Sequence, residues 1–478
     1  MALGLTKAKF RQMIILLAGA FIVVLNMTLL TPALNTIMHE MNVSQTTVQW
    51  LTSGYSLTEA VVIPMAAFFM GRFSNKRLFV GAMCVFSCGS LIGALSPSFS
   101  FLLLARVVQA CSTGLMMPMV TSIILVLIPK EHRGSAMGIV TLIIGFAPTI
   151  GPTLSGVLID TIGWRAIFAL ISALSLAIVA LSFFYMTSEV DFERASFDAP
   201  SVVLASFGLV SLLLGISSFS SSDNKLFNFA EVAVGLLLIG IYAKRQLSAE
   251  RPMLQVGVLK ESRYRTCVIV VCLIQGGLIG METIMPLYIQ VVLGEPATVS
   301  GLTLLPGAVL GAVTGVLAGR IFDKKGVRVP VICGVAMNAM GLVLLLCLSA
   351  SSPIWFVTIA YACVIMGLEF TMTPVNTWGI NSLPNNLVPH AQSTSNTINQ
   401  VAGSFGTALL VSVASMVSGA VANSSSVEAT FLGYHASFLA TTVIVGIALL
   451  TVIFFVKEPS KKSSTVPAMS PELKHSKS

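Results

Sequence analysis

The sequence is dominated by long apolar runs, each close to the roughly 20 residues that a helix needs to cross a bilayer. Fourteen such runs can be read along the chain, and they fall near residues 12–34, 47–70, 77–96, 100–127, 135–158, 165–187, 200–219, 228–246, 266–292, 299–321, 329–349, 353–375, 392–419 and 434–456. Apolar residues make up 55% of the 478 positions and charged residues only 10%. A soluble protein could not hide that much apolar surface, so the runs predict an all-α polytopic membrane protein.

The distribution of Lys and Arg predicts the orientation of the chain in the membrane. If the N-terminus is cytoplasmic, all but three of the 27 basic residues lie on the cytoplasmic side or in segments leading to it; the exceptions are Arg106, Arg165 and Lys225. Membrane proteins retain Lys and Arg preferentially on that side. An even number of spans then makes the C-terminus cytoplasmic too. The net charge of +8 reflects this bias, and we expect no nucleic-acid partner.

Weak self-similarity predicts two copies of a six-helix unit. Ala67–Leu78 resembles Gly319–Pro330, and Gly151 in the fifth run corresponds to Gly406 in the thirteenth at nearly the same separation. Parallel six-helix repeats with a substrate site between them are a known transporter architecture. We therefore expect an N-terminal six-helix bundle over 1–187, a linker with two additional transmembrane helices over 188–265, a C-terminal bundle over 266–457, and a disordered cytoplasmic tail over 458–478.

Four ionisable residues lie near the centres of predicted spans, which makes them candidate functional sites because a charge inside a bilayer is costly. They are Glu59, Arg106, Glu282 and Glu369. A carboxyl group removed from water favours its protonated form, and an arriving cation favours the ionised form and releases the proton. We predict that Glu282 and Glu369 bind protons or a cationic substrate in competition, with Glu59 as a further proton site. Arg106 would bias a nearby acid or link protonation to closure.

Structural roles are the alternatives for these charges. Glu59 could hydrogen-bond a neighbouring helix, and Glu369 could pair with Arg106 across the boundary between the bundles. Four uncharged polar residues are expected to line the cavity beside the charged ones: Asn26, Thr28, Gln109 and Gln275.

Two further groups of residues point to moving parts. The fifth run reads GFAPTIGPTLSG, in which Pro148 and Pro152 should bend a helix while Gly145, Gly151 and Gly156 let another helix approach closely. Two basic cytoplasmic loops follow the second and tenth runs; the first carries Arg72, Lys76 and Arg77, and the second carries Gly319, Arg320, Asp323, Gly326 and Arg328. The first loop has Gly71 where the second pattern has its Asp.

These motifs, together with Arg106 and Gln109 in the fourth run, resemble those of the major facilitator superfamily. The resemblance is closest to the fourteen-helix drug:proton antiporter branch of the lincomycin-resistance type, and it covers about residues 10–457. It implies that the second-half loop clamps helices on the cytoplasmic face, and that the Pro- and Gly-rich run is the antiporter motif, which seals one side of the cavity. It also matches an outer-loop pattern at Asp160–Phe168, in which Trp164 is expected to anchor the chain at the membrane interface. Asn26 stands where the family often has an acid.

We therefore expect a proton-coupled antiporter that exports amphipathic, often cationic drugs by alternating access across a bacterial plasma membrane. Its partners would be those substrates, protons and membrane lipids, and it would act as a monomer without a cofactor, driven by the proton gradient. The sequence has no phosphate-binding loop for ATP and no clustered catalytic or metal-binding residues, so an enzyme and an ATP-driven pump are not expected. A dedicated exporter of one endogenous lipid or metabolite remains the closest alternative, and a non-transporting membrane sensor a remote one.

Overall fold

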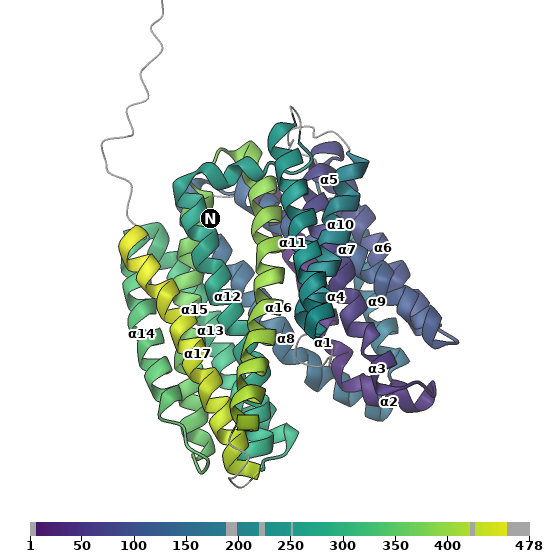
Figure 1. The fold of residues 1–478 in the computed structure, drawn as a ribbon. Helices are drawn as coiled ribbons and strands as arrows, with labels where there is room; N and C mark the ends of the chain where they lie inside the picture. Colours follow the sequence, from purple (N-terminus) through teal and green to yellow (C-terminus); the bar gives the residue numbers. More distant parts are fainter. Residues whose placement is uncertain (1–5, 188–197, 219–224, 250–251, 421–425, 457–478) are drawn as a thin grey trace, which may run out of the picture.

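The computed structural model describes residues 6–187, 198–218, 225–249, 252–420 and 426–456, and the predicted tail at 458–478 lies outside them. Within the described residues every regular element is helical. Thirteen of these helices are long and apolar enough to cross a membrane, and α8, Arg133–Thr161, is a further helix of 29 residues. The predicted all-α membrane fold is confirmed. The first and last helices have their outer termini at the same end of the molecule, the top in Figure 1, which is the cytoplasmic end.

Helices α1 to α9 make up what we call the N-bundle. Their bounds are α1 Lys7–Leu29, η2 Thr31–Ala33, α2 Leu34–Glu40, α3 Gln45–Val48, α4 Trp50–Val62, η3 Ile63–Met65, α5 Ala66–Arg72, α6 Asn75–Ala94, α7 Phe99–Leu127, η4 Lys130–His132, α8 Arg133–Thr161 and α9 Arg165–Tyr185.

The remaining helices form a hairpin and what we call the C-bundle. The hairpin is α10 Ala199–Ser218 and α11 Lys225–Ser248, followed by η5 Val256–Lys260. The C-bundle is α12 Ser262–Leu287, η6 Tyr288–Val292, α13 Ala297–Lys325, α14 Arg328–Leu346, α15 Ile354–Ile380, η7 Asn385–Leu387, α16 Val388–Ala420 and α17 Ser426–Phe455.

The second predicted span is interrupted in the middle. Helix α4 ends at Val62, a 3-10 turn of three residues contains Pro64, and α5 continues to Arg72. Proline cannot donate the backbone hydrogen bond of a helix and clashes with the preceding turn. The tighter 3-10 turn accommodates it, so one apolar run becomes two helical segments of a single span.

The last span begins earlier than its apolar run indicates. Helix α17 starts at Ser426, whereas the run begins near residue 434. The first turns of α17 carry Glu428 and His435, which lower the local hydropathy without breaking the helix. An apolar run therefore marks the part of a helix in the bilayer rather than the helix itself.

The two bundles meet where backbones touch. Helix α8 of the N-bundle packs along α13 of the C-bundle. A Cβ atom added to Gly138 would lie 2.8 Å from the carbonyl oxygen of Gly315, and one added to Gly319 would collide with the carbonyl of Gly134. Real Cβ contacts are not that short, so glycine is required on both helices for this approach.

An apolar seal joins the bundles at the cytoplasmic end. The largest hydrophobic cluster is built on the N-bundle, yet it also contains Tyr264 and Val268 of α12, Ile380 of α15, and Val388 and Ala391 of α16. All of these lie in the cytoplasmic parts of their helices. The cytoplasmic end of the molecule is thus closed in this conformation.

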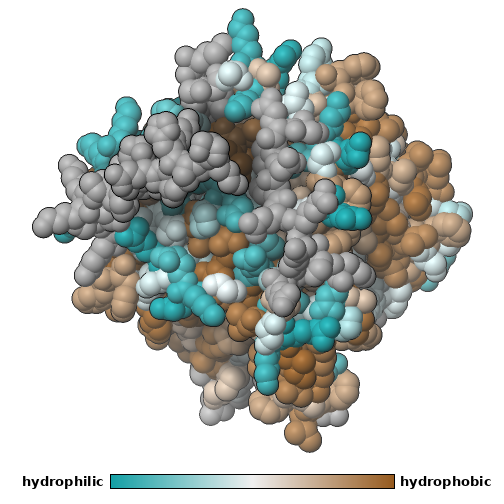
Figure 2. Space-filling view, turned by 90° about the horizontal axis from the view of Figure 1, so that it is seen from above, coloured by the Kyte–Doolittle hydropathy of each residue, from teal (hydrophilic) through white to brown (hydrophobic). Residues whose placement is uncertain are grey.

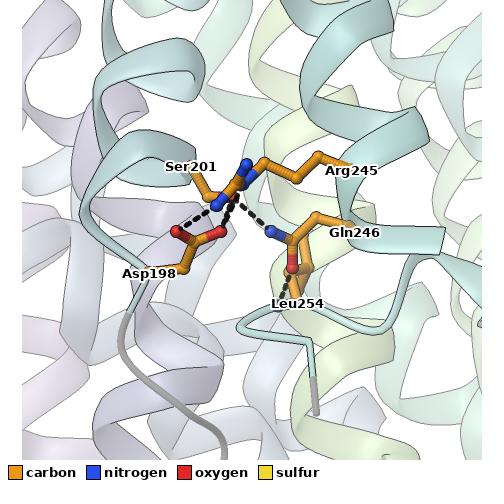
Figure 3. Close-up of polar contacts among 5 residues, drawn as sticks. All are labelled: Asp198, Ser201, Arg245, Gln246 and Leu254. Atoms are coloured by element: carbon orange, nitrogen blue, oxygen red, sulfur yellow. Dashed lines mark hydrogen bonds and ion pairs between the residues drawn. The ribbon is translucent and has the colours of Figure 1, made fainter. Parts of the chain in front are cut away.

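Polar contacts at the cytoplasmic base of the hairpin join its two helices to each other and to the segment that follows them (Figure 3). Arg245 donates to both carboxylate oxygens of Asp198 at 2.7 and 3.0 Å, and Gln246 donates to the hydroxyl of Ser201 at 2.7 Å. The Arg245 guanidinium and the Ser201 hydroxyl lower the pKa of Asp198 below its ordinary value. Leu254, whose backbone N–H donates to Gln246, packs with Met253 against Phe68 of α5.

The surface agrees with a membrane setting. Figure 2 looks onto the cytoplasmic end and shows hydrophilic side chains gathered over it, with apolar side chains along the flanks. Many large apolar side chains are exposed on the hairpin, including Phe207 at 66% and Leu237 at 64%. Lipid is the solvent that such a belt requires.

Candidate functional site

Arg106 is buried in the core of the N-bundle. Only 1% of its surface is exposed. Its Nε donates to the carbonyl oxygen of Leu51 at 3.1 Å, its Nη1 donates to Oε1 of Gln109 at 3.0 Å, and its guanidinium lies 4.0 Å from the ring centroid of Tyr55. Hydrogen bonds and an aromatic face together replace part of the hydration that a buried guanidinium loses.

The network continues from Gln109 to two other helices. Its Nε2 donates to the Ser90 hydroxyl of α6 at 2.8 Å, and Asn26 of α1 donates to Gln109 Oε1 at 3.4 Å. Asn26 and Gln109 are 1% and 0% exposed. In this conformation the two predicted cavity-lining residues therefore contact each other inside the bundle.

Glu59 lies in the same core, on α4. It is 5% exposed, and its Oε2 has no hydrogen-bond partner among the described residues. Its charge interacts with that of Arg106. A carboxyl group in this position is held next to a fixed positive charge and away from water.

The acids of the C-bundle are more open. Glu282, well inside the membrane-spanning helix α12, is exposed, and Glu369 on α15 is half-buried. Helices α12 and α15 pack against each other, so the two acids lie on contacting helices of the C-bundle. Gly311 of α13 packs against the same face of α15: a Cβ added there would lie 2.6 Å from the Ile365 side chain and 3.6 Å from Cγ of Glu369. Two acids on facing helices thus form one site.

Gln275 and Glu282 share a face of α12, because seven residues make two helical turns. Gln275 is half-buried, as is Thr28 on α1. The structure therefore groups the predicted site residues by bundle: Arg106, Glu59, Asn26 and Gln109 in the first, Glu282, Glu369 and Gln275 in the second. Arg106 contacts Tyr55 and Gln109 in this structure. It does not form the pair with Glu369 that was one alternative from the sequence.

The motif in α8 meets different neighbours along its length. A Cβ on Gly151 would collide with the Thr28 hydroxyl of α1, and one on Gly145 would lie 3.6 Å from Ala312 of α13. Gly156 has nothing within 4 Å among the described residues, so the close approach predicted there is wrong. The side chains of Pro148 and Pro152 lie outside the description, although α8 runs through both positions.

In the second-half loop, Asp323 links the end of α13 to the start of α8. Asp323 accepts hydrogen bonds from the backbone N–H groups of Gly134 and Ser135 at 2.8 and 2.7 Å, and from the Ser135 hydroxyl. These are the unpaired donors at the N-terminus of α8, where the helix dipole favours a negative charge. Gly326 ends α13 with φ of 76°, a conformation that favours glycine. Arg320 and Arg328 are exposed.

The first-half loop works within its own bundle. Lys76 donates to the carbonyl oxygen of Phe183 on α9 at 2.6 Å and lies over the Phe183 ring. Arg72 and Arg77 are exposed. With Gly71 in place of an acid, this loop binds α9, whereas Asp323 binds across the bundles.

Sequence reasoning missed Arg133, which strengthens the link between the bundles. It is 1% exposed and donates from Nη1 to Asn381 at 3.1 Å and from Nη2 to Asn385 at 2.8 Å, both in the loop after α15. The only hint in the sequence was a polar loop after the twelfth run. Nothing local connects a basic residue with two amides so far along the chain.

A second missed cluster lies at the opposite end of the N-bundle. Glu40 accepts from Trp164 Nε1 at 2.6 Å and from Arg165, whose guanidinium covers the Trp164 ring. These two hydrogen bonds lower the pKa of Glu40 below 4.5. Trp164 is 1% exposed, so the predicted interface anchor is wrong: its polar edge is satisfied by Glu40 rather than by water.

Among the described residues, no group of three or more His, Cys, Asp or Glu side chains could hold a metal ion. Two helical bundles that meet through glycine contacts, each carrying ionisable residues on membrane-spanning helices, define a multi-pass membrane transporter rather than an enzyme.

Comparison with known proteins gives the family. The Major Facilitator Superfamily model matches residues 16–407, and the chain belongs to that superfamily. It is 37% identical over 458 residues to YcnB, an uncharacterized MFS-type transporter of Bacillus subtilis. The aligned region covers 95% of this chain and 96% of YcnB. It is 34% identical to the lincomycin resistance protein LmrB of the same organism, over 84% of each chain.

More distant proteins agree. A multidrug resistance protein B homolog of Mycobacterium tuberculosis is 27% identical over 80% of this chain and 72% of its own. Among solved structures, the proton:xylose symporter XylE has a TM-score of 0.63 at 16% identity, covering 94% of this chain and 96% of that one. The last likeness shows the fold alone. With relatives from bacteria, the chain is a multi-pass plasma-membrane transporter.

Proposed function

We propose that this transporter is a proton-coupled antiporter that exports amphipathic, often cationic compounds. It would act as a monomer by alternating access, with the proton gradient as its energy source and no cofactor. The observation that carries the proposal is the presence of two acids, Glu282 and Glu369, on contacting membrane-spanning helices of the C-bundle.

The chemistry of the pair supports exchange. Two carboxyl groups that interact do not ionise independently, because the charge of one opposes the charge of the other. The pair therefore retains a proton readily, and an arriving cation offsets the second negative charge and releases that proton. Glu282 is exposed and can meet both a solute and water.

The contacts between the bundles support alternation. Asp323 and Arg133 hold the cytoplasmic ends together through hydrogen bonds that a small separation would break. The glycine contacts between α8 and α13 provide a tight surface for rocking. In the N-bundle, the Glu59–Arg106 pair is a candidate for linking protonation to that motion.

The names of two relatives support a drug-like substrate. The proteins of Bacillus subtilis and Mycobacterium tuberculosis are called lincomycin resistance and multidrug resistance proteins. We infer the same substrate class for this chain.

The test is substrate-driven proton release. Purified protein in proteoliposomes with an imposed pH gradient would be exposed to amphipathic cations, lincosamide antibiotics and fatty acids. Collapse of the gradient by several unrelated drugs, lost in Glu282→Gln, is the expected result. A response to one lipid or metabolite alone would instead identify a dedicated exporter, and no response from correctly folded protein would contradict proton coupling.

A further inference from the structure

Buried polar atoms without partners gather in one part of the C-bundle. Five of the side-chain atoms that have no hydrogen-bond partner among the described residues belong to the stretch 376–399: Asn376 Oδ1, Gln392 Nε2, Ser393 Oγ, Thr394 Oγ1 and Asn399 Oδ1. A buried polar atom without a partner raises the free energy of the conformation that buries it. Such a concentration calls for a functional explanation.

These atoms lie in the cytoplasmic half of the boundary between the bundles. Asn376 is near the cytoplasmic end of α15, and Gln392 is in the second turn of α16. Their neighbours Ile380, Val388 and Ala391 belong to the apolar seal. When the cytoplasmic end opens, this is the region that water and a cytoplasmic substrate enter first.

On α16 the amides follow the helix toward the acidic site. Gln392 and Asn399 lie two turns apart and so share a face, which Gly403 continues one turn further. A Cβ on Gly403 would lie 3.3 Å from Ile279 of α12. Ile279 shares its own face with Gln275 and Glu282. The amides of α16 therefore run along the side of α12 that carries Glu282.

A second row runs down α15. Glu369, Thr373 and Asn376 are spaced four and three residues apart and share one face. The hydroxyl of Thr373 lies 3.0 Å from that of Thr141 on α8, so this face meets the N-bundle. The row on α15 begins at Glu369, and the row on α16 runs beside the face of α12 that carries Glu282; both continue with uncharged side chains toward the cytoplasm.

We propose that Asn376, Gln392 and Asn399 form an uncharged hydrogen-bonding subsite that binds the hydroxyl or amide groups of a substrate when the cytoplasmic end is open. The inference rests on the proposed export function and assigns separate roles to the acids and the amides of the site. The acids select for positive charge, while the amides, which have both donors and acceptors, select for neutral polar groups. A substrate with such groups would favour opening, because it supplies the partners that the closed form lacks.

Direct binding to the purified full-length protein, without a gradient, tests the subsite. The two probes are lincomycin, a cation with an amide and several hydroxyl groups, and tetraphenylphosphonium, a cation with no hydrogen-bonding group. In Asn376→Leu and Asn399→Leu the affinity for lincomycin should fall about tenfold each, and that for tetraphenylphosphonium by less than about twofold. Asn399→Gln, which keeps an amide, should recover most of the lincomycin affinity.

Asn338→Leu is the matched control. Like Asn376 and Asn399, Asn338 of the C-bundle has a buried Oδ1 without a partner among the described residues, but its Nδ2 donates to the carbonyl oxygen of Val364 between α14 and α15 at 3.1 Å. Asn338→Leu should change the affinities for lincomycin and tetraphenylphosphonium to the same extent. If Asn399→Leu fails to fold, Asn399→Ser, which retains only a short hydroxyl, serves instead, and Asn376→Leu provides an independent measurement.

Three results would overturn the subsite: equal weakening of both probes, which indicates a change in gating; no change for either probe; or a wild type that binds tetraphenylphosphonium but not lincomycin. The proposed function fails separately. If both probes bind with the expected selectivity but neither releases protons from liposomes, the subsite stands and proton coupling does not. A wild type that binds neither probe contradicts both proposals.

Discussion

The two bundles treat the charges inside the membrane in opposite ways. In the N-bundle, Arg106 is 1% exposed and is held by a carbonyl, an amide and an aromatic ring. In the C-bundle, Glu282 is exposed and Glu369 is half-buried. Arg106 and Glu369 occupy the fourth long helix of their respective bundles, so a repeated architecture has acquired two different chemistries. One half fixes a charge within its core, and the other leaves its ionisable side chains less buried.

The cytoplasmic loops differ in the same sense. Asp323 of the C-bundle reaches the N-terminus of α8 in the N-bundle, whereas Lys76 of the N-bundle loop binds α9 beside it. The contact between the bundles at this end is therefore asymmetric. Replacing single members of each half should reveal the asymmetry directly.

The largest effect is expected on transport. Glu282→Gln should reduce substrate-driven proton release by more than about tenfold, because an amide cannot exchange a proton for a cation. Fluorescence of a pH indicator in proteoliposomes measures it. Glu295→Gln is the control. Glu295 lies between the membrane-spanning segments that end at Val292 and begin at Thr298, so this variant should release protons as the wild type does. Unchanged proton release in Glu282→Gln would exclude Glu282 from the exchange site.

The next effect is on stability. Arg106→Ala removes a fully buried charge and leaves Gln109 Oε1 and the Leu51 carbonyl without that donor. Leaving a buried acceptor without its donor costs about 1–3 kcal/mol for each acceptor. Glu282→Ala, at an exposed position, should cost less than about 1 kcal/mol. Thermal unfolding of the purified variants measures both, and equal losses in the two variants would contradict the contrast between the bundles.

A smaller effect is expected on the conformational balance. Asp323→Ala removes three hydrogen bonds to the start of α8, which should favour opening of the cytoplasmic end by about 1–3 kcal/mol. A single cysteine introduced as Val388→Cys, at a buried position of the apolar seal between the bundles, would report opening. In a background without the other cysteines, its labelling should accelerate in Asp323→Ala.

Lys76→Met is the matched change in the first-half loop. Because Lys76 binds within the N-bundle, its loss should leave labelling of the cysteine at position 388 unchanged. If Lys76→Met accelerates labelling as much as Asp323→Ala, the two loops contribute equally to closure and the asymmetry is wrong.

The smallest effect concerns pH at the outer cluster. Arg165 and Trp164 lower the pKa of Glu40 in the folded protein below its ordinary 4.5. The ionised carboxylate therefore stabilises the fold above pH 4.5, and this contribution is lost as the pH falls through the lowered value. Because Glu40 and Arg165 are 45% and 41% exposed, the effect should stay below about 1 kcal/mol.

Glu40→Gln should remove that acid-dependent part of the stability curve while changing proton release little. Thermal unfolding measured from pH 6 down to about pH 3 compares the two proteins. A variant that loses stability in parallel with the wild type over this range would show that Glu40 contributes nothing measurable.

Sequence alone determined the class of fold and the orientation. An apolar run long enough to span a bilayer is expected to form a helix, since every backbone polar group must be paired inside lipid and a helix pairs them within one segment. The positions of Glu59, Arg106, Glu282 and Glu369 could also be read directly, because a charge within an apolar run is visible without knowledge of packing. Even Gly319 and Asp323 were recognisable from their local pattern.

Only the tertiary structure decided how these residues are used. Arg106 pairs with Gln109 and Tyr55 rather than with Glu369, Trp164 is buried against Glu40, and Arg133 joins two amides from the other bundle. The hydropathy of a run is a sum over neighbours in the chain, so it reports the helix and its solvent. Partners across helices depend on which faces meet and how closely, and glycines such as Gly134 and Gly319 fix that only once both helices are in place.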